Sequence, residues 1–186
     1  MSGQRDDRQL IAQAAAGDRQ AFAELVRRHQ GWVLQLTYRY TRDRQDAEEL
    51  GQEIFFKAWR SASSFRGESA FSTWLYRLAV NACLNHRQKI KARPVPVSLA
   101  GDPEGGEPQT TDVLVVAERE ALLREAMSAL PARQRLALAL ASFEDKSYEE
   151  IAEVMDVSVA SVESLLFRAR RKLAAALRPL RSRGEL

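Results

Sequence analysis

The segment from residue 147 to residue 173 constrains the fold most, because it encodes two short helices that meet at a sharp turn. Ser147 and Glu150 have the spacing of a capping box, which predicts the start of the first helix. Ser158 has the chemistry of a second N-cap and predicts another helix over 159–178. The apolar residues of this second helix recur at steps of three and four, which indicates one buried face; they are Val159, Val162, Leu166, Ala169 and Leu173.

The opposite face of the second helix predicts a contact with DNA. At 100° per residue this face carries Ala160, Ser164, Phe167, Arg168 and Arg171. The chain from 164 to 183 has seven basic side chains and no acidic one. An outward aromatic ring with arginines on a helix-turn-helix is typical of a recognition helix in the major groove. The alternative is a structural helix corner whose cations are merely solvated.

Proline, glycine and acidic residues divide the chain into two parts. Residues 93–112 hold four of the six prolines, three glycines and four acidic side chains, which predicts an extended linker over 92–112. The linker separates an N-terminal domain over 4–91 from a C-terminal domain over 113–178. Since neither half alternates polar and apolar residues as strands do, we predict an all-α fold of two small helical domains.

Eight helices are expected in these two domains. In the N-terminal domain they span 6–16, 18–41, 43–62 and 70–90, with a loop at 65–69 before the last one. In the C-terminal domain they span 113–129, 131–142, 148–155 and 159–178.

The helix over 70–90 carries an unusual polar stripe. Its residues Trp74, Arg77, Asn81, Asn85 and Gln88 lie at steps of three and four. Aromatic, arginine and amide side chains in such a row suit single-stranded nucleic acid, because rings stack on bases and amides read base edges. The alternative, which periodicity leaves equally open, is a core tryptophan beside solvated asparagines.

The helix over 43–62 has acidic side chains early and basic ones late. Asp46, Glu48, Glu49 and Glu53 precede Lys57 and Arg60. This order complements the helix dipole, which is a sufficient structural explanation, but an acidic face on a DNA-binding protein also suits protein docking. Gly51 costs this helix about 1 kcal/mol relative to alanine, which hints at close approach of another group.

Composition narrows the function classes. No apolar run approaches the roughly 20 residues of a membrane span, and the N-terminus lacks the apolar segment of a secretory signal. One cysteine, Cys83, excludes an internal disulfide framework and fits a reducing cytoplasm. We therefore expect a cytoplasmic protein without membrane insertion.

No enzymatic activity, cofactor or metal is expected. His29 and His86 are isolated, and no glycine-rich phosphate loop is present. Cys83 and His86 lie three residues apart, but two ligands do not make a zinc site, so a buried thiol is the better interpretation.

Three segments, at 46–60, 65–85 and 147–173, together resemble a bacterial sigma factor of the sigma-70 family, in its extracytoplasmic-function (ECF) group. The resemblance spans nearly the whole chain, in order and with the expected spacing. It implies the second and fourth sigma domains joined by a linker. The implied function is that of a transcription initiation factor, which binds core RNA polymerase, directs it to promoters with −35 and −10 elements and assists DNA melting.

The resemblance also implies roles for particular residues. Those that match the segment docking on the polymerase clamp are Glu49, Leu50, Gln52 and Glu53. Those that match the −10 region are Phe65, Ser69, Ala70 and Phe71 in a loop that receives a flipped base, with Trp74, Arg77, Asn81 and Asn85 on the adjoining helix. Those expected at the −35 element are Glu163, Ser164, Phe167, Arg168 and Arg171.

The partners implied are the clamp and flap regions of core RNA polymerase, promoter DNA and an anti-sigma factor, which can hold the protein at the inner membrane face. Glu163 and Leu165 stand where many relatives carry basic residues, and Gly51 replaces a usual branched apolar residue. These departures leave the −35 sequence and the geometry of the clamp face open. A second possibility is an ordinary helix-turn-helix regulator that binds duplex DNA without polymerase.

Overall fold

The computed structural model describes residues 6–92, 111–142 and 146–178, and within these ranges the chain is entirely helical and has no strand. The elements are α1 (Asp7–Ala15), α2 (Arg19–Thr41), α3 (Arg44–Arg60), a short 3-10 helix η1 (Ala62–Ser64), α4 (Phe71–Ala92), α5 (Thr111–Ser128), α6 (Ala132–Ala141), α7 (Tyr148–Met155) and α8 (Val159–Ala176). The all-α prediction is confirmed, and every predicted helix is present within a few residues of its expected bounds.

Side-chain caps explain why the boundaries were readable from the sequence. Asp18 Oδ1 accepts hydrogen bonds from the backbone N–H groups of Gln20 and Ala21, at 2.8 and 3.1 Å, and so begins α2. Asp43 caps α3 in the same way. The expected helix over 43–62 instead ends at Arg60, because the chain tightens there into η1.

The capping box predicted before α7 is present. Glu150 N–H donates to Ser147 Oγ at 3.2 Å, and Ser147 N–H donates to Glu150 Oε2 at 2.8 Å. The bond from the Ser147 backbone, followed by that from Lys146, lowers the pKa of the Glu150 carboxyl. Asp156 then adopts a left-handed conformation with φ 52°, which turns the chain sharply toward Ser158 and α8.

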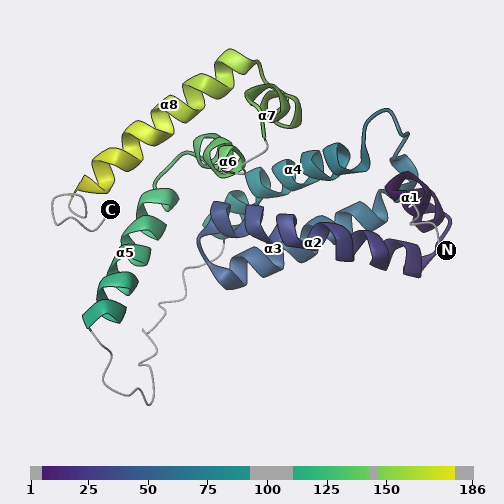
Figure 1. Ribbon diagram of the computed structural model, residues 1–186, viewed down its shortest axis with the longest axis horizontal. Helices are drawn as coiled ribbons and strands as arrows, with labels where there is room; N and C mark the ends of the chain where they lie inside the picture. Colours follow the sequence, from purple (N-terminus) through teal and green to yellow (C-terminus); the bar gives the residue numbers. More distant parts are fainter. Residues whose placement is uncertain (1–5, 93–110, 143–145, 179–186) are drawn as a thin grey trace.

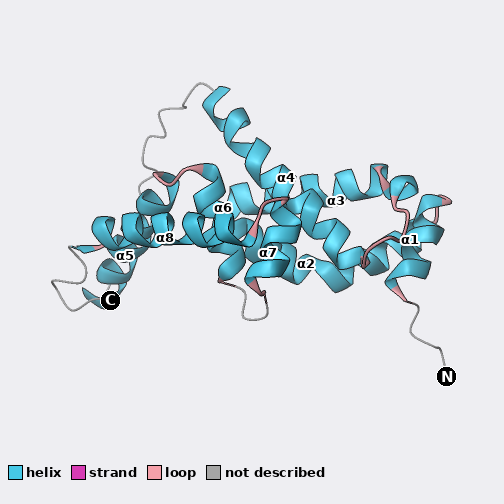
Figure 2. Ribbon diagram, turned by 90° about the horizontal axis from the view of Figure 1, so that it is seen from above, coloured by secondary structure: helices cyan, strands magenta, loops and turns pink. Residues whose placement is uncertain are grey.

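The N-terminal domain is built on α2, α3 and α4, with α1 at one end (Figures 1 and 2). Its core consists of apolar side chains that are withdrawn from water, and each contributes about 1.5–3 kcal/mol by burial. The largest fully buried ones are Leu10, Ile11, Leu25, Leu36, Tyr40, Leu50, Ile54 and Leu75.

In the C-terminal domain α6 packs against the helix-turn-helix of α7 and α8 (Figure 1), and the last turns of α5 contact α8. Val162 and Leu166, from the predicted apolar face of α8, are buried in this core. Ile151 and Met155 of α7 are buried with them. Ala169 of α8 belongs to a smaller apolar cluster with α5.

The two domains pack directly against each other, which the sequence analysis did not anticipate. Helix α4 contacts α3 on one side and α6 and α7 on the other (Figure 1), and one apolar cluster includes buried residues of both domains. Two cations of the C-terminal domain lie over aromatic rings of the N-terminal domain: Arg135 over Tyr40 at 4.2 Å and Lys146 over Tyr76 at 4.6 Å. The physical reason is that α4 is apolar around much of its circumference, since Leu75, Tyr76, Ala79, Val80 and Cys83 are all buried.

The predicted linker over 92–112 falls almost wholly on residues outside the described ranges, so its flexibility and the domain boundaries stay predictions.

We expect Ser147→Ala to lower the free energy of unfolding by about 1 kcal/mol, because it removes the side-chain cap of α7. Chemical denaturation followed by circular dichroism measures the change. Ser164→Ala is the matched control: Ser164 is exposed in the interior of α8, so this variant should not lose stability. Equal losses in both variants would contradict the capping role.

Candidate nucleic-acid interface

The outward face of α8 carries the side chains predicted for duplex DNA. Phe167 is 65% exposed, and Glu163, Ser164, Arg168 and Arg171 are exposed beside it. Val162, Leu166 and Ala169 on the other side of the same helix are fully buried, which fixes this face outward. In Figure 1, α8 lies at the outer edge of the C-terminal domain.

Three aromatic rings form a cluster where the loop at 65–70 meets α4. The ring centroids of Phe65, Phe71 and Trp74 lie 5.5–6.1 Å from one another. Phe71 is only 4% exposed, whereas Phe65 and Trp74 are half-buried. Trp74 therefore does not stand free on an exposed stripe: part of its ring belongs to this cluster, and part remains accessible.

The same loop encloses a pocket of about 460 Å³. Phe65, Ser69, Ala70 and Phe71, the four loop residues predicted to receive a base, all line it. The first residues of α1 supply the facing side, namely Asp6, Asp7 and Arg8. The sequence analysis missed α1 here, because no local pattern signals a contact between segments some 60 residues apart.

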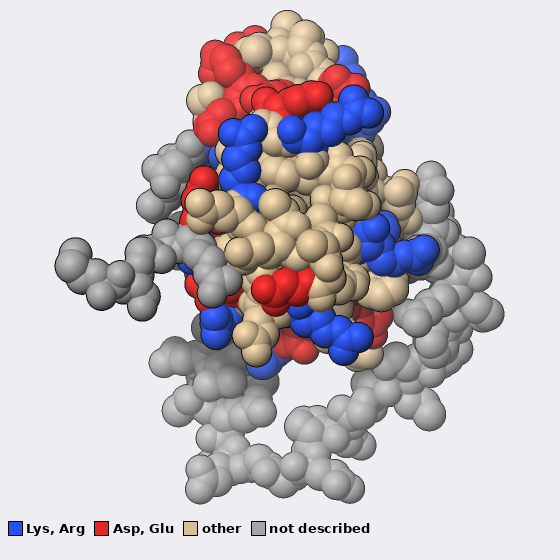
Figure 3. Space-filling model, turned by 90° about the vertical axis from the view of Figure 1, so that its right-hand side faces the viewer, with Lys and Arg blue, Asp and Glu red and all other residues tan. Residues whose placement is uncertain are grey.

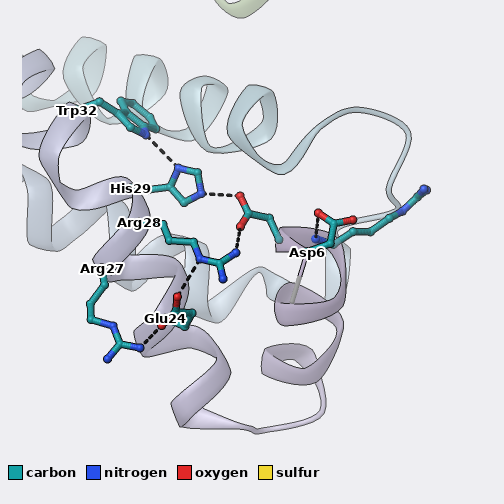
Figure 4. Close-up of polar contacts among 8 residues, drawn as sticks. Asp6, Glu24, Arg27, Arg28, His29 and Trp32 are labelled. Atoms are coloured by element: carbon teal, nitrogen blue, oxygen red, sulfur yellow. Dashed lines mark hydrogen bonds and ion pairs between the residues drawn. The ribbon is translucent and has the colours of Figure 1, made fainter. Parts of the chain in front are cut away.

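A polar network fixes α1 on α2 beneath this pocket (Figure 4). Asp7 binds His29 Nε2 at 2.7 Å and Arg28 Nη1 at 2.8 Å, one contact for each carboxylate oxygen. Trp32 Nε1–H donates to His29 Nδ1 at 3.1 Å, so the proton of a neutral His29 lies on Nε2 and is donated to Asp7. The His29 ring in turn meets Phe71 edge-on, with centroids 5.1 Å apart, which connects the network to the aromatic cluster.

The predicted polymerase-docking residues lie on α3 with mixed exposure. Glu49 and Gln52 are exposed, and Glu53 is half-buried and paired with Lys57 at 2.7 Å. Leu50 is 1% exposed, so its side chain lies in the core, and its part in the predicted docking face is to hold α3 in place.

Two apolar grooves border these residues. One, of about 590 Å³, lies between α2 and α3, and Gly51 and Gln52 line it. The other, of about 940 Å³, is lined by Gln52, Glu53 and Leu78. Phe56 lines both grooves and is 60% exposed, although the sequence analysis gave it no role. The paired phenylalanines at 55 and 56 were the available signal, since adjacent residues on a helix cannot face the same way.

Gly51 is not required by close packing. A Cβ at this position would lie 3.4 Å from Leu34 Cδ2, which is an ordinary van der Waals contact. The glycine therefore leaves room in the groove between α2 and α3 rather than relieving a clash.

The chain matches two families of sigma-factor domains. "Sigma-70 region 2" matches residues 25–93 and "Sigma-70, region 4" matches residues 120–173. The chain is 40% identical to the RNA polymerase sigma-H factor of Pseudomonas aeruginosa, over 97% of this chain and 98% of that protein. It is also 40% identical to the ECF RNA polymerase sigma-E factor of Haemophilus influenzae, over 97% and 100%. The chain belongs to the ECF group of the sigma-70 family.

Solved structures agree with this assignment. CnrH, in complex with the cytosolic domain of CnrY, superposes with a TM-score of 0.66 at 27% identity, over 93% of this chain and 97% of that one. The sigma factor RpoE of Bartonella quintana, in complex with the anti-sigma factor NepR, shares the fold with a TM-score of 0.59 at 21% identity, over 84% and 96%. This sigma factor is therefore a promoter-specific initiation factor of RNA polymerase, and that prediction is confirmed.

The domain contact of this sigma factor reaches the polar stripe of α4. Arg77 Nη2 pairs with Glu153 Oε1 of α7 at 3.2 Å. Arg77 and Asn81 also line a hollow of about 380 Å³ with residues 153–156. Asn85 is exposed, and the side chain of Gln88 is not among those described. In this arrangement the C-terminal domain thus lies against residues predicted to hold separated DNA.

Cys83 of the sigma factor is a buried thiol, as predicted. It has no exposed surface, and burial raises its pKa to about 12. His86 lies near Asp46, with Nε2 and Oδ2 3.9 Å apart. Among the described residues, no three histidine, cysteine or acidic side chains group as metal ligands would, and none of the described helices combines the length and apolarity that crossing a membrane requires.

We expect Cys83 to resist thiol reagents at pH 8 until the protein unfolds. The colour reaction with Ellman's reagent, with and without guanidinium, measures this. A Ser164→Cys variant is the control, because its exposed thiol should react at once without denaturant. Stability should also fall as pH rises from about 8.5 toward 12, since over that range the unfolded thiol has lost its proton and the folded one has not. Rapid reaction of Cys83 in the native protein would contradict its burial.

Proposed function

We propose that this sigma factor reads −35 DNA with α8, captures −10 bases in the pocket beside α1, and docks on core RNA polymerase through α3. The observation that carries the proposal is the convergence of Phe65, Ser69, Ala70 and Phe71 on one pocket next to the half-exposed ring of Trp74. Binding of this kind needs no catalytic group, so the protein acts as a non-enzymatic factor without a cofactor.

At the −35 element, α8 enters the major groove with Ser164 and Phe167 toward the base edges. Arg168 and Arg171 contact the phosphates that flank the groove, and these contacts supply most of the salt-dependent affinity. Glu163 does not bind phosphate; its carboxylate accepts a hydrogen bond from a cytosine amino group.

At the −10 element, a base leaves the duplex and enters the pocket at the loop. Extrusion costs a few kcal/mol, and stacking on an aromatic ring returns about 1–3 kcal/mol per base. Trp74 stacks at the edge of the separated strand, while Arg77, Asn81 and Asn85 hold that strand along α4. Strand opening is therefore driven by binding energy rather than by nucleotide hydrolysis.

On polymerase, the α3 face binds the clamp and the C-terminal domain meets the flap. The acidic side chains of Glu49 and Glu53 provide the polar part of the clamp contact. The grooves on either side of Phe56 provide its apolar part, because exposed apolar surface of this kind marks an interaction site. Polymerase then fixes the distance between the two DNA-binding surfaces, which raises the effective concentration of each.

Promoter binding also requires the two domains to separate. The pair between Arg77 and Glu153 engages α4 on the same stripe that the DNA strand follows. Docking on polymerase replaces this contact and frees the stripe.

An anti-sigma factor regulates this protein in the cytoplasm. Two relatives by fold support this regulation: RpoE of Bartonella quintana binds the anti-sigma factor NepR, and CnrH binds the cytosolic domain of CnrY. A membrane-bound inhibitor would hold the sigma factor at the inner membrane face until a signal releases it.

Reconstitution with core RNA polymerase tests the proposal. Promoter-specific transcription from selected fragments is expected only when both proteins are present. Specific binding of the chain alone to duplex DNA, with no effect on polymerase, would instead favour an ordinary helix-turn-helix regulator.

We expect Trp74→Ala to reduce open-complex formation about tenfold, which corresponds to the loss of one stacked base. Its binding to a −35 duplex should be unchanged. Phe167→Ala is the reciprocal control and should weaken −35 binding more than melting. Permanganate footprinting of unpaired thymines measures melting, and fluorescence anisotropy measures duplex binding. If each variant lost melting and −35 binding to the same extent, the result would contradict separate surfaces for the two promoter elements.

We expect Arg171→Ala to weaken −35 binding about equally for all sequences and to reduce the slope of log affinity against log salt by about one. Arg133→Ala, on the exposed side of α6, removes the same charge at a distance and should leave the slope unchanged. Anisotropy titrations from about 50 to 200 mM salt supply both slopes. A changed base preference with an unchanged slope would contradict a phosphate contact.

A further inference from the structure

A hydrogen bond ties the middle of the loop at 65–70 to the first turn of α1. Arg8 Nη2 donates to the Gly67 carbonyl oxygen at 2.7 Å, across 59 positions of sequence. Helix α1 lies before residue 25, where the match to sigma-70 region 2 begins. The contact therefore joins a part of the chain outside that match to the loop that receives a base.

The contact explains why a glycine fits at position 67. Its φ of 72° lies in the left-handed region, where glycine is favoured. A Cβ on Gly67 would lie 2.5 Å from Arg8 Nη2 and 2.9 Å from Arg8 Nε, so the guanidinium occupies the space that any other side chain would need. The guanidinium thus lies directly against the loop backbone.

Arg8 is held in place by contacts of its neighbours in α1. The adjacent Asp7 binds Arg28 and His29 of α2, and the Asp6 side chain caps α1 by accepting from the Arg8 backbone N–H (Figure 4). Leu10 and Ile11, further along the helix, are buried in the core. The backbone of Arg8 is therefore held in place while its guanidinium group extends to the loop.

Arg8 lines two hollows. It lines the pocket of about 460 Å³ on the side of Ser69 and Phe71, and a second hollow of about 340 Å³ on the side of Ala62 and Arg66. Phe65 and Gly67 line both hollows as well. Removing the Arg8 side chain would therefore take away one of the groups that line both hollows.

Figure 3 views the molecule from the end at which α1 lies. On this face uncharged surface lies between separate patches of acidic and basic side chains, which do not form one continuous acidic surface.

We infer that Arg8 is a positioning residue for base capture: it fixes the Gly67 carbonyl so that the pocket is already formed before DNA arrives. This inference rests on the proposed function of the loop. A loop held in its binding shape loses less conformational freedom on binding, which gains affinity and sharpens discrimination at the captured base.

Selection from a pool of random single-stranded oligonucleotides tests the inference. Holoenzyme made with core RNA polymerase and each full-length variant is used to select and sequence bound strands. With Arg8→Ala we expect about tenfold weaker binding of the strands that the wild-type protein selects, with base preference lost at one position and kept at the others. Arg8→Lys, which keeps one donor, should restore part of that preference.

Arg66→Ala is the matched control, because it removes an exposed arginine from the same loop. It should weaken binding at low salt but leave the selected pattern intact. Hydrogen exchange of the free protein adds a readout without DNA: in Arg8→Ala, amides of residues 66–70 should exchange faster while the helices keep their protection.

A double-variant cycle tests whether Arg8 acts through Gly67. Gly67→Ala should itself disturb the loop, and adding Arg8→Ala to it should cost less than Arg8→Ala costs alone. An unchanged base pattern in Arg8→Ala would overturn the inference while the proposed function stands. Failure of the wild-type holoenzyme to select any strand pattern would overturn the proposed function, and the inference with it.

Discussion

The structure depends above all on the apolar surface of α4, which is buried on more than one side. Leu75 and Ala79 face the core of the N-terminal domain as the helical stripe requires, yet Tyr76, Val80 and Cys83 are buried as well. An amphipathic helix with one apolar face packs against a single core. A helix with a wider apolar surface needs other helices on a second side to shield it from water. Helices α2 and α3 cover it from one side, and α6 and α7 from the other (Figure 1). The domain contact is thus a consequence of how far apolar side chains extend around a single helix.

The same helix begins at the loop that lines the pocket proposed to receive a base, so the packing of α4 and the proposed recognition site meet there. Phe71, the first residue of α4, is buried against His29, and Trp74 follows one turn later with part of its ring exposed. The buried ring orients the start of the helix, and the exposed part of the Trp74 ring lies where we propose that a separated strand stacks. On the far side of the loop, α1 contributes its first turn through Asp7 and Arg8. A binding surface made of half-buried rings on a fixed frame costs little rotamer entropy when a base arrives.

Much of the fold could be predicted from the sequence, because caps and periodicity are local. Ser147 with Glu150, Ser158 and Asp43 set helix starts at the expected residues, and the outward placement of Phe167 followed from the 3.6-residue period alone. The rest depends on contacts between distant segments. Nothing near Gly67 signals Arg8, and the buried position of Leu50 depends on how α2 and α4 enclose α3. The docking of the C-terminal domain was not predicted, because Tyr76 and Val80 lie on α4 between the core residues Leu75 and Ala79 and the polar stripe.

The contact between the two domains combines an exposed ion pair with apolar surface, which is compatible with the domain separation proposed above. Its ion pair, Arg77 with Glu153, joins side chains that are about half exposed, and such pairs contribute about 0–1 kcal/mol. Of the two cation–ring contacts, that of Lys146 with Tyr76 is partly exposed, whereas Arg135 and Tyr40 are buried, and a buried contact of this kind contributes about 2 kcal/mol. The apolar part is larger, but it is the kind of surface that a partner can replace with its own apolar side chains. Under the function proposed above, a separated state is favoured whenever polymerase and DNA together cover α4 better than α7 does, and separation frees Arg77 from its pair with Glu153.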